Sequence, residues 1–162
     1  MAPPPSATDM SSNSESSLRT KGSQMTEHVG ERFARALADK DSVGLKALLR
    51  PDVDFRAMTP TRFWESNDVD VIVDETILGT WFSPPRRITE IIAVETGCIG
   101  SLESVTYRFM VDRPDGQFTI EQQAYYETDG ATISWMRLMC SGFLLLSPAD
   151  PQTSAVSGAG EG

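Results

Sequence analysis

The feature that most constrains the fold of this chain is a series of four strand-like runs in its second half, each separated from the next by a short turn sequence. The runs cover residues 88–99, 104–111, 117–127 and 131–143. The turns between them read Gly100-Ser101, Arg113-Pro114-Asp115-Gly116 and Thr128-Asp129-Gly130. Each turn contains glycine, proline or aspartate, residues that suit the positive or preset φ angles of tight turns. Because strands joined this closely pair with their neighbours in sequence, the pattern predicts an antiparallel meander.

Two short helices are predicted before the meander. The first has an apolar stripe at helical spacing, formed by Val29, Phe33, Ala36 and Leu37. Asp41 or Ser42 is a good N-cap for the second helix, which would end at Pro51 because proline cannot continue a helix. Each helix therefore has one apolar face to bury against the rest of the domain.

The segment between these helices and the meander predicts extended structure followed by a third helix. Residues 53–59 alternate between apolar and polar side chains, as a half-buried strand does. Residues 62–65 form a second, shorter extended piece. A helix over residues 68–81 follows, with Ser66 or Asn67 as its N-cap.

The two ends of the chain differ in composition from the middle. Residues 1–24 contain seven serines and three prolines, and all thirteen aromatic residues lie between Phe33 and Phe143. Segments with so little apolar surface cannot offset the entropy of ordering their backbone. We therefore predict a disordered N-terminal arm at residues 1–24, one folded domain at residues 25–146 and a disordered C-terminal tail at residues 147–162.

The net charge of −9 limits the partners that the chain can have. Binding to phosphate groups needs clustered lysine and arginine, and the sequence has one adjacent basic pair, Arg86-Arg87. Nucleic acid and anionic membrane are therefore not expected as partners. The apolar stretches are too short to span a bilayer and no secretory signal is visible, so we predict a cytoplasmic protein.

The sequence lacks the usual signatures of cofactor and metal sites. Residues 97–100 contain two glycines, but not the third glycine and the following helix of a dinucleotide fingerprint. Four acids gather near the start of the third helix: Asp68, Asp70, Asp74 and Glu75. They resemble a metal site in composition only, because acids are favoured in the first turn of any helix. Cys98 and Cys140 have no metal-ligand spacing, so we expect neither a metal nor a cofactor.

The order helix, helix, strand, helix and four antiparallel strands resembles the nuclear transport factor 2-like superfamily. The segments that carry the resemblance are RFARALADKD at residues 32–41, LLRPDV at 48–53 and GATISW at 130–135. The superfamily includes the SnoaL-like polyketide cyclases, the ketosteroid isomerases and the limonene epoxide hydrolases. The resemblance covers nearly all of residues 26–143. It implies an α+β cone, in which a strongly curved, mostly antiparallel sheet wraps around three N-terminal helices and leaves a pocket inside.

The catalytic residues of these enzymes do not carry over to this sequence. Where ketosteroid isomerases have a tyrosine, a general base and a second acid, the matching positions here are Phe33, Ala57 and Gln122. The epoxide hydrolases use an Asp-Arg-Asp arrangement, and neither Arg108 nor Arg137 has an aspartate two residues away. The acid at the end of the last strand in SnoaL-type cyclases is also missing from residues 138–142. The catalytic residues therefore stay unknown, and the resemblance does not decide whether the chain is an enzyme.

Alternation along the predicted strands indicates which side chains face the inside of the cone. The predicted ligand-binding lining is Phe33, Phe55, Ala57, Trp64, Tyr107, Phe109, Gln122, Tyr126, Trp135, Arg137 and Met139. Mostly aromatic walls with a few polar groups are typical of a small-molecule site. An inward Arg137 would either pair with an acid, such as Glu65 or Glu95, or bind an anionic group of the ligand.

Three functions remain open at this point. The first is a SnoaL-like pocket protein that binds a small, largely apolar molecule carrying a carbonyl or a carboxylate. The second is an enzyme of the same fold, acting on a polyketide-, steroid- or terpene-like substrate. The third is an interaction module, a homodimer whose pocket is filled by its own side chains. Alternation assigns Glu121, Gln123, Tyr125, Ser134 and Met136 to the outer sheet face, which would be either exposed to water or the surface of a dimer.

Overall fold

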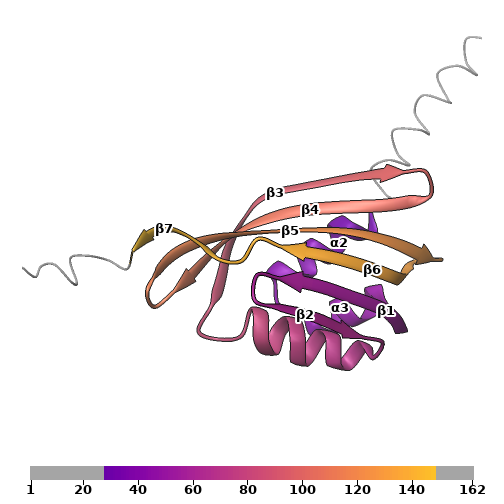
Figure 1. Cartoon of the computed structure of the whole chain (residues 1–162), viewed down its shortest axis with the longest axis horizontal. Helices are drawn as coiled ribbons and strands as arrows, with labels where there is room; N and C mark the ends of the chain where they lie inside the picture. Colours follow the sequence, from indigo (N-terminus) through magenta and orange to yellow (C-terminus); the bar gives the residue numbers. More distant parts are fainter. Residues whose placement is uncertain (1–27, 149–162) are drawn as a thin grey trace, which may run out of the picture.

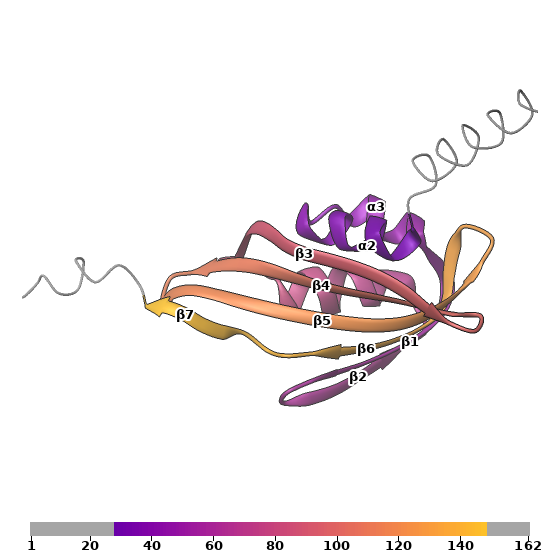
Figure 2. The same ribbon diagram turned by 90° about the horizontal axis from the view of Figure 1, so that it is seen from above.

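The computed structural model of the chain describes residues 28–148. In this part of the chain, helices pack against one face of a curved, seven-stranded sheet (Figures 1 and 2). The helices are α2 (Val29–Ala38), α3 (Ser42–Leu48) and η1 (Val71–Trp81). The predicted α+β class, with a curved and mostly antiparallel sheet, is confirmed.

The sheet joins an N-terminal hairpin to the long meander. Its strands are β1 (Leu49–Thr59), β2 (Arg62–Ser66), β3 (Arg87–Ile99), β4 (Leu102–Arg113), β5 (Gly116–Asp129), β6 (Thr132–Cys140) and β7 (Leu144–Pro148). Their order is β2-β1-β6-β5-β4-β3, and β7 pairs with β5. β1 and β6 are parallel, whereas the other pairings in the described sheet are antiparallel.

Helices α2 and α3 form where the sequence predicts them. In the predicted apolar stripe of α2, Phe33 and Leu37 are buried, and Val29 and Ala36 are partly buried against the core. The carboxylate of Asp41 accepts a hydrogen bond of 2.9 Å from the backbone N–H of Gly44, so the predicted N-cap of α3 is confirmed. The chain is already extended at Leu49, two residues before the proline that was expected to end the helix.

The third helix, η1, is a π-helix, with hydrogen bonds that reach five residues back instead of four. The N–H of Phe82, just after its end, bonds to the carbonyl of Ile77 at 2.9 Å. Because each turn is wider than an α-helical turn, side chains four to five residues apart share one face. The wider turn places Ile72, Ile77 and Trp81 together on the buried face. The sequence predicts a helix here but not its width.

The prediction of one continuous strand over residues 131–143 is wrong. β6 ends at Cys140, and Gly142 has a φ of +81°, in the left-handed region that favours glycine. The chain then resumes as β7, which pairs with β5 beyond the point where β6 leaves it. The predicted arm at residues 1–24 lies outside the described residues, as does the predicted tail except for Ser147 and Pro148, which end β7.

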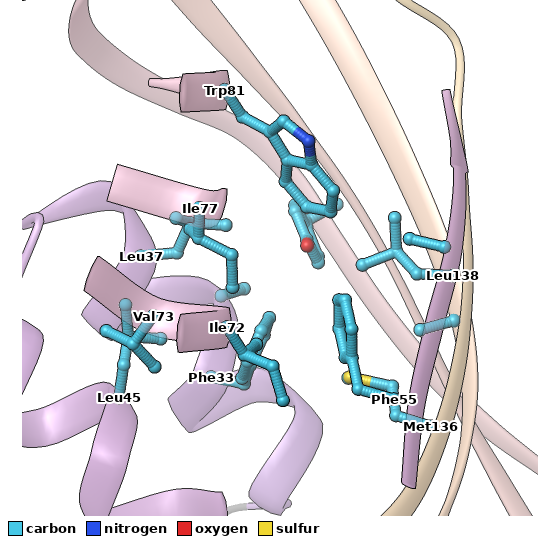
Figure 3. Packing of buried hydrophobic residues seen from close by; sticks show 14 of the residues in the cluster. Phe33, Leu37, Leu45, Phe55, Ile72, Val73, Ile77, Trp81, Met136 and Leu138 are labelled. Atoms are coloured by element: carbon cyan, nitrogen blue, oxygen red, sulfur yellow. The ribbon is translucent and has the colours of Figure 1, made fainter. Parts of the chain in front are cut away.

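The core lies between the helices and the concave face of the sheet. Figure 3 shows Phe33, Ile72 and Ile77 from the helices opposite Phe55 and Met136 from the sheet. All five side chains are almost completely buried. Burial of each such large apolar side chain contributes about 1.5–3 kcal/mol, so this contact layer fixes how the helices sit on the sheet.

Candidate functional site

Most of the predicted pocket residues meet inside the cone. Seven of them are at most 2% exposed: Phe33, Phe55, Ala57, Tyr107, Phe109, Gln122 and Tyr126. The ring of Phe33 on α2 lies 6.3 Å from that of Tyr107 on β4, and Tyr107 stacks 5.0 Å from Phe109 on the same strand. The hydroxyl of Tyr126 accepts a 2.9 Å hydrogen bond from the N–H of Gly30 on α2, which ties this ring to the helix.

A β-bulge reverses the predicted facing of β6. On β5, Thr128 pairs with Ile133 while the preceding residue pairs with Trp135, so Ser134 is an extra residue on β6. As a result Ile133 and Met136 are both buried, although they are three residues apart. In an unbroken strand two such residues would face opposite sides of the sheet.

The predictions that Trp135, Arg137 and Met139 face the interior are therefore wrong. All three lie on the outer face of the sheet, and Met139 is 57% exposed. The inner positions after the bulge belong instead to Met136, Leu138 and Cys140. Met136 was expected on the outer face, so that prediction is wrong for the same reason.

Arg137 has protein partners on the outer face. Its guanidinium bonds to a carboxylate oxygen of Asp54 at 3.1 Å and to the backbone carbonyls of Asp54 and Met136, each at 3.0 Å. The same group lies 4.3 Å from the centre of the Trp135 ring. The alternative in which Arg137 pairs with an acid is thus the one observed, with Asp54 in place of the acids expected.

Trp64 lies at the rim of the interior. Its ring is half-buried on β2 and meets Trp81 edge to face at 6.0 Å. Its indole N–H donates to the hydroxyl of Thr59 at 3.0 Å. Trp64 and Phe55 line a cleft of about 440 Å³ between β2 and η1, whose other walls are mostly polar.

The polar centre of the interior is a pair formed by Tyr107 and Gln122. The Tyr107 hydroxyl donates a short hydrogen bond of 2.6 Å to the amide oxygen of Gln122. Burial, with a smaller effect from nearby Cys140, raises the pKa of the Tyr107 hydroxyl well above its ordinary value, so it remains a donor. The other end of the amide, Nε2 of Gln122, is buried without a hydrogen-bond partner among residues 28–148.

Trp81 contributes a second unsatisfied donor that the sequence analysis missed. Its indole Nε1 is buried and, within the described residues, has no partner. The ring packs 6.2 Å from Phe55. Val73, Ile77 and Trp81 stand at i, i+4 and i+8, and this helical spacing of apolar residues is a sequence signal that could have placed Trp81 on the buried face.

The interior offers hydrogen-bond donors but no charged groups. The buried polar side chains of residues 28–148 are Thr76 and Gln122, so no carboxylate, histidine or amine is buried with them. General acid–base catalysis needs a group that changes protonation near neutral pH, and Tyr107 does not. The arrangement can hold an oxygen atom by hydrogen bonds.

The outer face of the sheet carries exposed apolar side chains in register across three strands. Phe63 pairs with Met58, and Met58 pairs with Met139. These three residues, the outer apolar strip, are 52%, 49% and 57% exposed. Met139 also lines two shallow grooves of about 440 and 500 Å³, one running past Tyr125 and the other toward the leucines of β7.

Other candidate features do not form sites in the described part of the chain. No three or more His, Cys, Asp or Glu side chains gather there as a metal ion would require. Asp74, one of the acids near the start of η1, bonds to Lys46 at 2.6 Å and to Ser42 at 2.8 Å. No helix among the described residues is both long and apolar enough to cross a bilayer.

Comparison with known proteins identifies the fold. No family model and no curated protein matches this sequence. A solved protein from Rhodopseudomonas palustris, named provisionally as an isomerase, is 15% identical with a TM-score of 0.54, over 73% of this chain and 93% of that one. An NTF2-like protein from Burkholderia thailandensis is 15% identical with a TM-score of 0.52, over 70% and 88% of the two chains. An LEH-like epoxide hydrolase from M. tuberculosis is 13% identical with a TM-score of 0.51, over 70% and 80%.

These likenesses bear out the expected fold. The chain has the nuclear transport factor 2-like fold, and its neighbours include proteins named for different activities. Because one fold hosts several chemistries, the likeness identifies neither a reaction nor a ligand.

Proposed function

We propose that this protein binds one compact, mostly apolar molecule inside its cone and that the amide of Gln122 holds it. The observation that carries the proposal is the buried Nε2 of Gln122, which has no partner within residues 28–148. A buried donor left unpaired costs roughly 1–3 kcal/mol, and a ligand oxygen would recover that free energy.

The hydrogen bond from Tyr107 supports this role by fixing the amide. Because the amide oxygen of Gln122 accepts the Tyr107 proton at 2.6 Å, the NH₂ group must point the other way. The Tyr107 ring in turn contacts the buried rings of Phe33 and Phe109, which suit an apolar ligand body. Binding is proposed in preference to turnover because no carboxylate, histidine or lysine is buried among residues 28–148.

Native mass spectrometry of protein purified from its own host tests this proposal. We expect a bound small molecule on the wild type and on Gln123→Met, a matched control on the outer face next to the proposed donor. We expect no bound molecule on the double variant Gln122→Met, Tyr107→Phe, which removes the donor without stranding the tyrosine hydroxyl. Retention of the same molecule by the folded double variant, or an empty wild type, would contradict the proposal.

The outer apolar strip favours a second proposal, that two copies of the chain associate through their outer sheet faces. Phe63, Met58 and Met139 expose a continuous apolar row, and monomeric proteins rarely leave large patches of this kind uncovered. The charged neighbours on this face are already paired, Arg108 with Glu121 at 2.7 Å and Arg137 with Asp54 at 3.1 Å. A second strip of the same composition would cover this row without leaving charges unpaired.

A further inference from the structure

We infer that the indole N–H of Trp81 is a second donor to the molecule in the cone, and that this molecule presents a neutral carbonyl oxygen and not a carboxylate. The inference rests on the proposed interior site and goes further by naming the class of ligand. It follows from two buried N–H groups, one on the sheet and one on the helix layer, that have no partner within residues 28–148.

Trp81 differs from the other tryptophan at the rim. The indole N–H of Trp64 is satisfied by the Thr59 hydroxyl at 3.0 Å. That of Trp81 has no such neighbour, although its ring is only 6% exposed. Figure 3 shows the Trp81 nitrogen on the ring edge that faces the sheet, above Phe55 and on the side of Leu138. The unsatisfied donor therefore faces the layer between helix and sheet and not solvent.

The strand register puts the row of the sheet that Trp81 faces next to the row of Gln122. Leu138, which Trp81 faces, pairs with Ala57 on one side and Ala124 on the other. The next inward residue along β6 is Cys140, which pairs with Gln122. Neighbouring inward rows on a strand are two residues apart, about 6.5–7 Å. The row between the donors carries two alanines, Ala57 and Ala124, beside Leu138.

Because no charged side chain is buried among residues 28–148, the interior favours a ligand whose oxygen is neutral. A carboxylate taken out of water needs a cation beside it, and the buried polar side chains of the described residues are Thr76 and Gln122. The arginine expected inside, Arg137, lies on the outer face and bonds to Asp54. A ketone, ester, lactone or amide oxygen needs only N–H donors, which is the hydrogen-bonding capacity left open here.

Matched ligand pairs test the class of molecule. The probes are 2-tetralone, 2-decalone and 4-phenylcyclohexanone, each compared at pH 8 with the carboxylic acid of the same ring skeleton, and binding is measured by calorimetry on the full chain. We expect the ketones to bind at least tenfold more tightly than the ionised acids. Equal or tighter binding of the acids overturns the carbonyl assignment while leaving an interior site in place. If neither series binds and host-purified protein is empty, the proposed function itself fails.

A pair of tryptophan variants tests the donor. Trp81→Phe keeps an aromatic ring and removes the free N–H, whereas Trp64→Phe removes an N–H that Thr59 already uses. We expect Trp81→Phe to weaken ketone binding about three- to tenfold and Trp64→Phe to change it less than twofold. Equal losses in the two folded variants would mean that Trp81 acts through packing alone and would overturn its role as donor.

Discussion

A glycine on α2 shows how closely single residues are matched inside this cone. The backbone N–H of Gly30 donates to the hydroxyl of Tyr126 at 2.9 Å. A Cβ at Gly30 would lie 2.7 Å from that hydroxyl and 2.7 Å from Cβ of Val105. The helix can approach β4 and β5 this closely only because the residue has no side chain.

Burial of the Tyr126 ring gives the protein a specific dependence on alkaline pH, and it outweighs the Gly30 hydrogen bond, which lowers the pKa of this tyrosine. Burial raises the pKa of Tyr126 to about 12, whereas a tyrosine in the unfolded chain ionises near pH 10. The contribution of neutral Tyr126 is complete below pH 10 and is lost between pH 10 and 12, because ionisation there favours the unfolded chain. It amounts to about 2–3 kcal/mol at most.

Urea unfolding of wild type and Tyr126→Phe at several pH values measures this effect. At pH 8 we expect the variant to be about 1–3 kcal/mol less stable, because the Gly30 N–H loses its acceptor. The difference should shrink between pH 10 and 12, since phenylalanine cannot ionise. A constant difference across that range would show that Tyr126 titrates as it does in the unfolded state.

At the scale of elements, substitutions at two neighbouring residues of β6 test which of them faces the core, and so test the position of the bulge. Arg137→Met removes an exposed ion pair with Asp54 and should cost less than about 1 kcal/mol. Met136→Ala, one residue away, removes a fully buried side chain and should cost about 2–5 kcal/mol. Thermal or urea denaturation of both variants decides between the two facings. The reverse order of effects would restore the facing that simple alternation predicts.

Because η1 is wider than an α-helix, we expect a glycine-to-alanine substitution in it to destabilise the protein instead of stabilising it. In an α-helix, replacing an exposed glycine by alanine stabilises the protein by about 0.5–1 kcal/mol. A Cβ at Gly79 would instead collide with the backbone carbonyl oxygen of Asp74, five residues back. Gly79→Ala is therefore expected to lower the free energy of unfolding, as measured by urea denaturation. Stabilisation by this substitution would mean that the segment can be α-helical at no cost.

The sequence predicts those elements whose causes are local. The turns around Gly100, Gly116 and Gly130 have positive φ at glycine, and the cap of α3 is formed by Asp41 as expected. The bulge at Ser134 has no such local cause, because neither glycine nor proline marks it. It arises where β6 must satisfy β5 on one side and β1 on the other, which is a tertiary requirement.

In the candidate site, too, the sequence predicts correctly the residues whose position follows from local alternation. The residues on β1, β4 and β5, whose alternation is unbroken at the site, were placed inside correctly: Phe55, Ala57, Tyr107, Phe109, Gln122 and Tyr126. The residues on β6 were assigned to the wrong face by one extra residue. Trp81 was missed because only strand alternation and the first helix were used to choose lining residues, although Val73, Ile77 and Trp81 share a face at helical spacing.

At the scale of the whole molecule, the outer apolar strip predicts association in solution. Met139→Glu places a charge at the β6 end of the strip, whereas Val43→Glu places one on α3, where the side chain is 78% exposed. Sedimentation velocity should show a dimer for wild type and Val43→Glu and a monomer for Met139→Glu, which loses apolar contact and introduces like-charge repulsion across the interface. A monomeric wild type, or a Met139→Glu dimer of unchanged affinity, would contradict association through this face.

The parallel pairing of β1 with β6 bears on how the chain is made. One edge of β1 is covered by β2, a near neighbour in sequence, but the other is covered by β6, so that Asp54 lies beside Trp135. A nascent chain that has not yet reached Thr132 therefore carries a complete hairpin with one open edge, able to pair with any other extended chain. Until β6 has been synthesised, something other than β6 has to keep this edge of β1 from pairing with other chains.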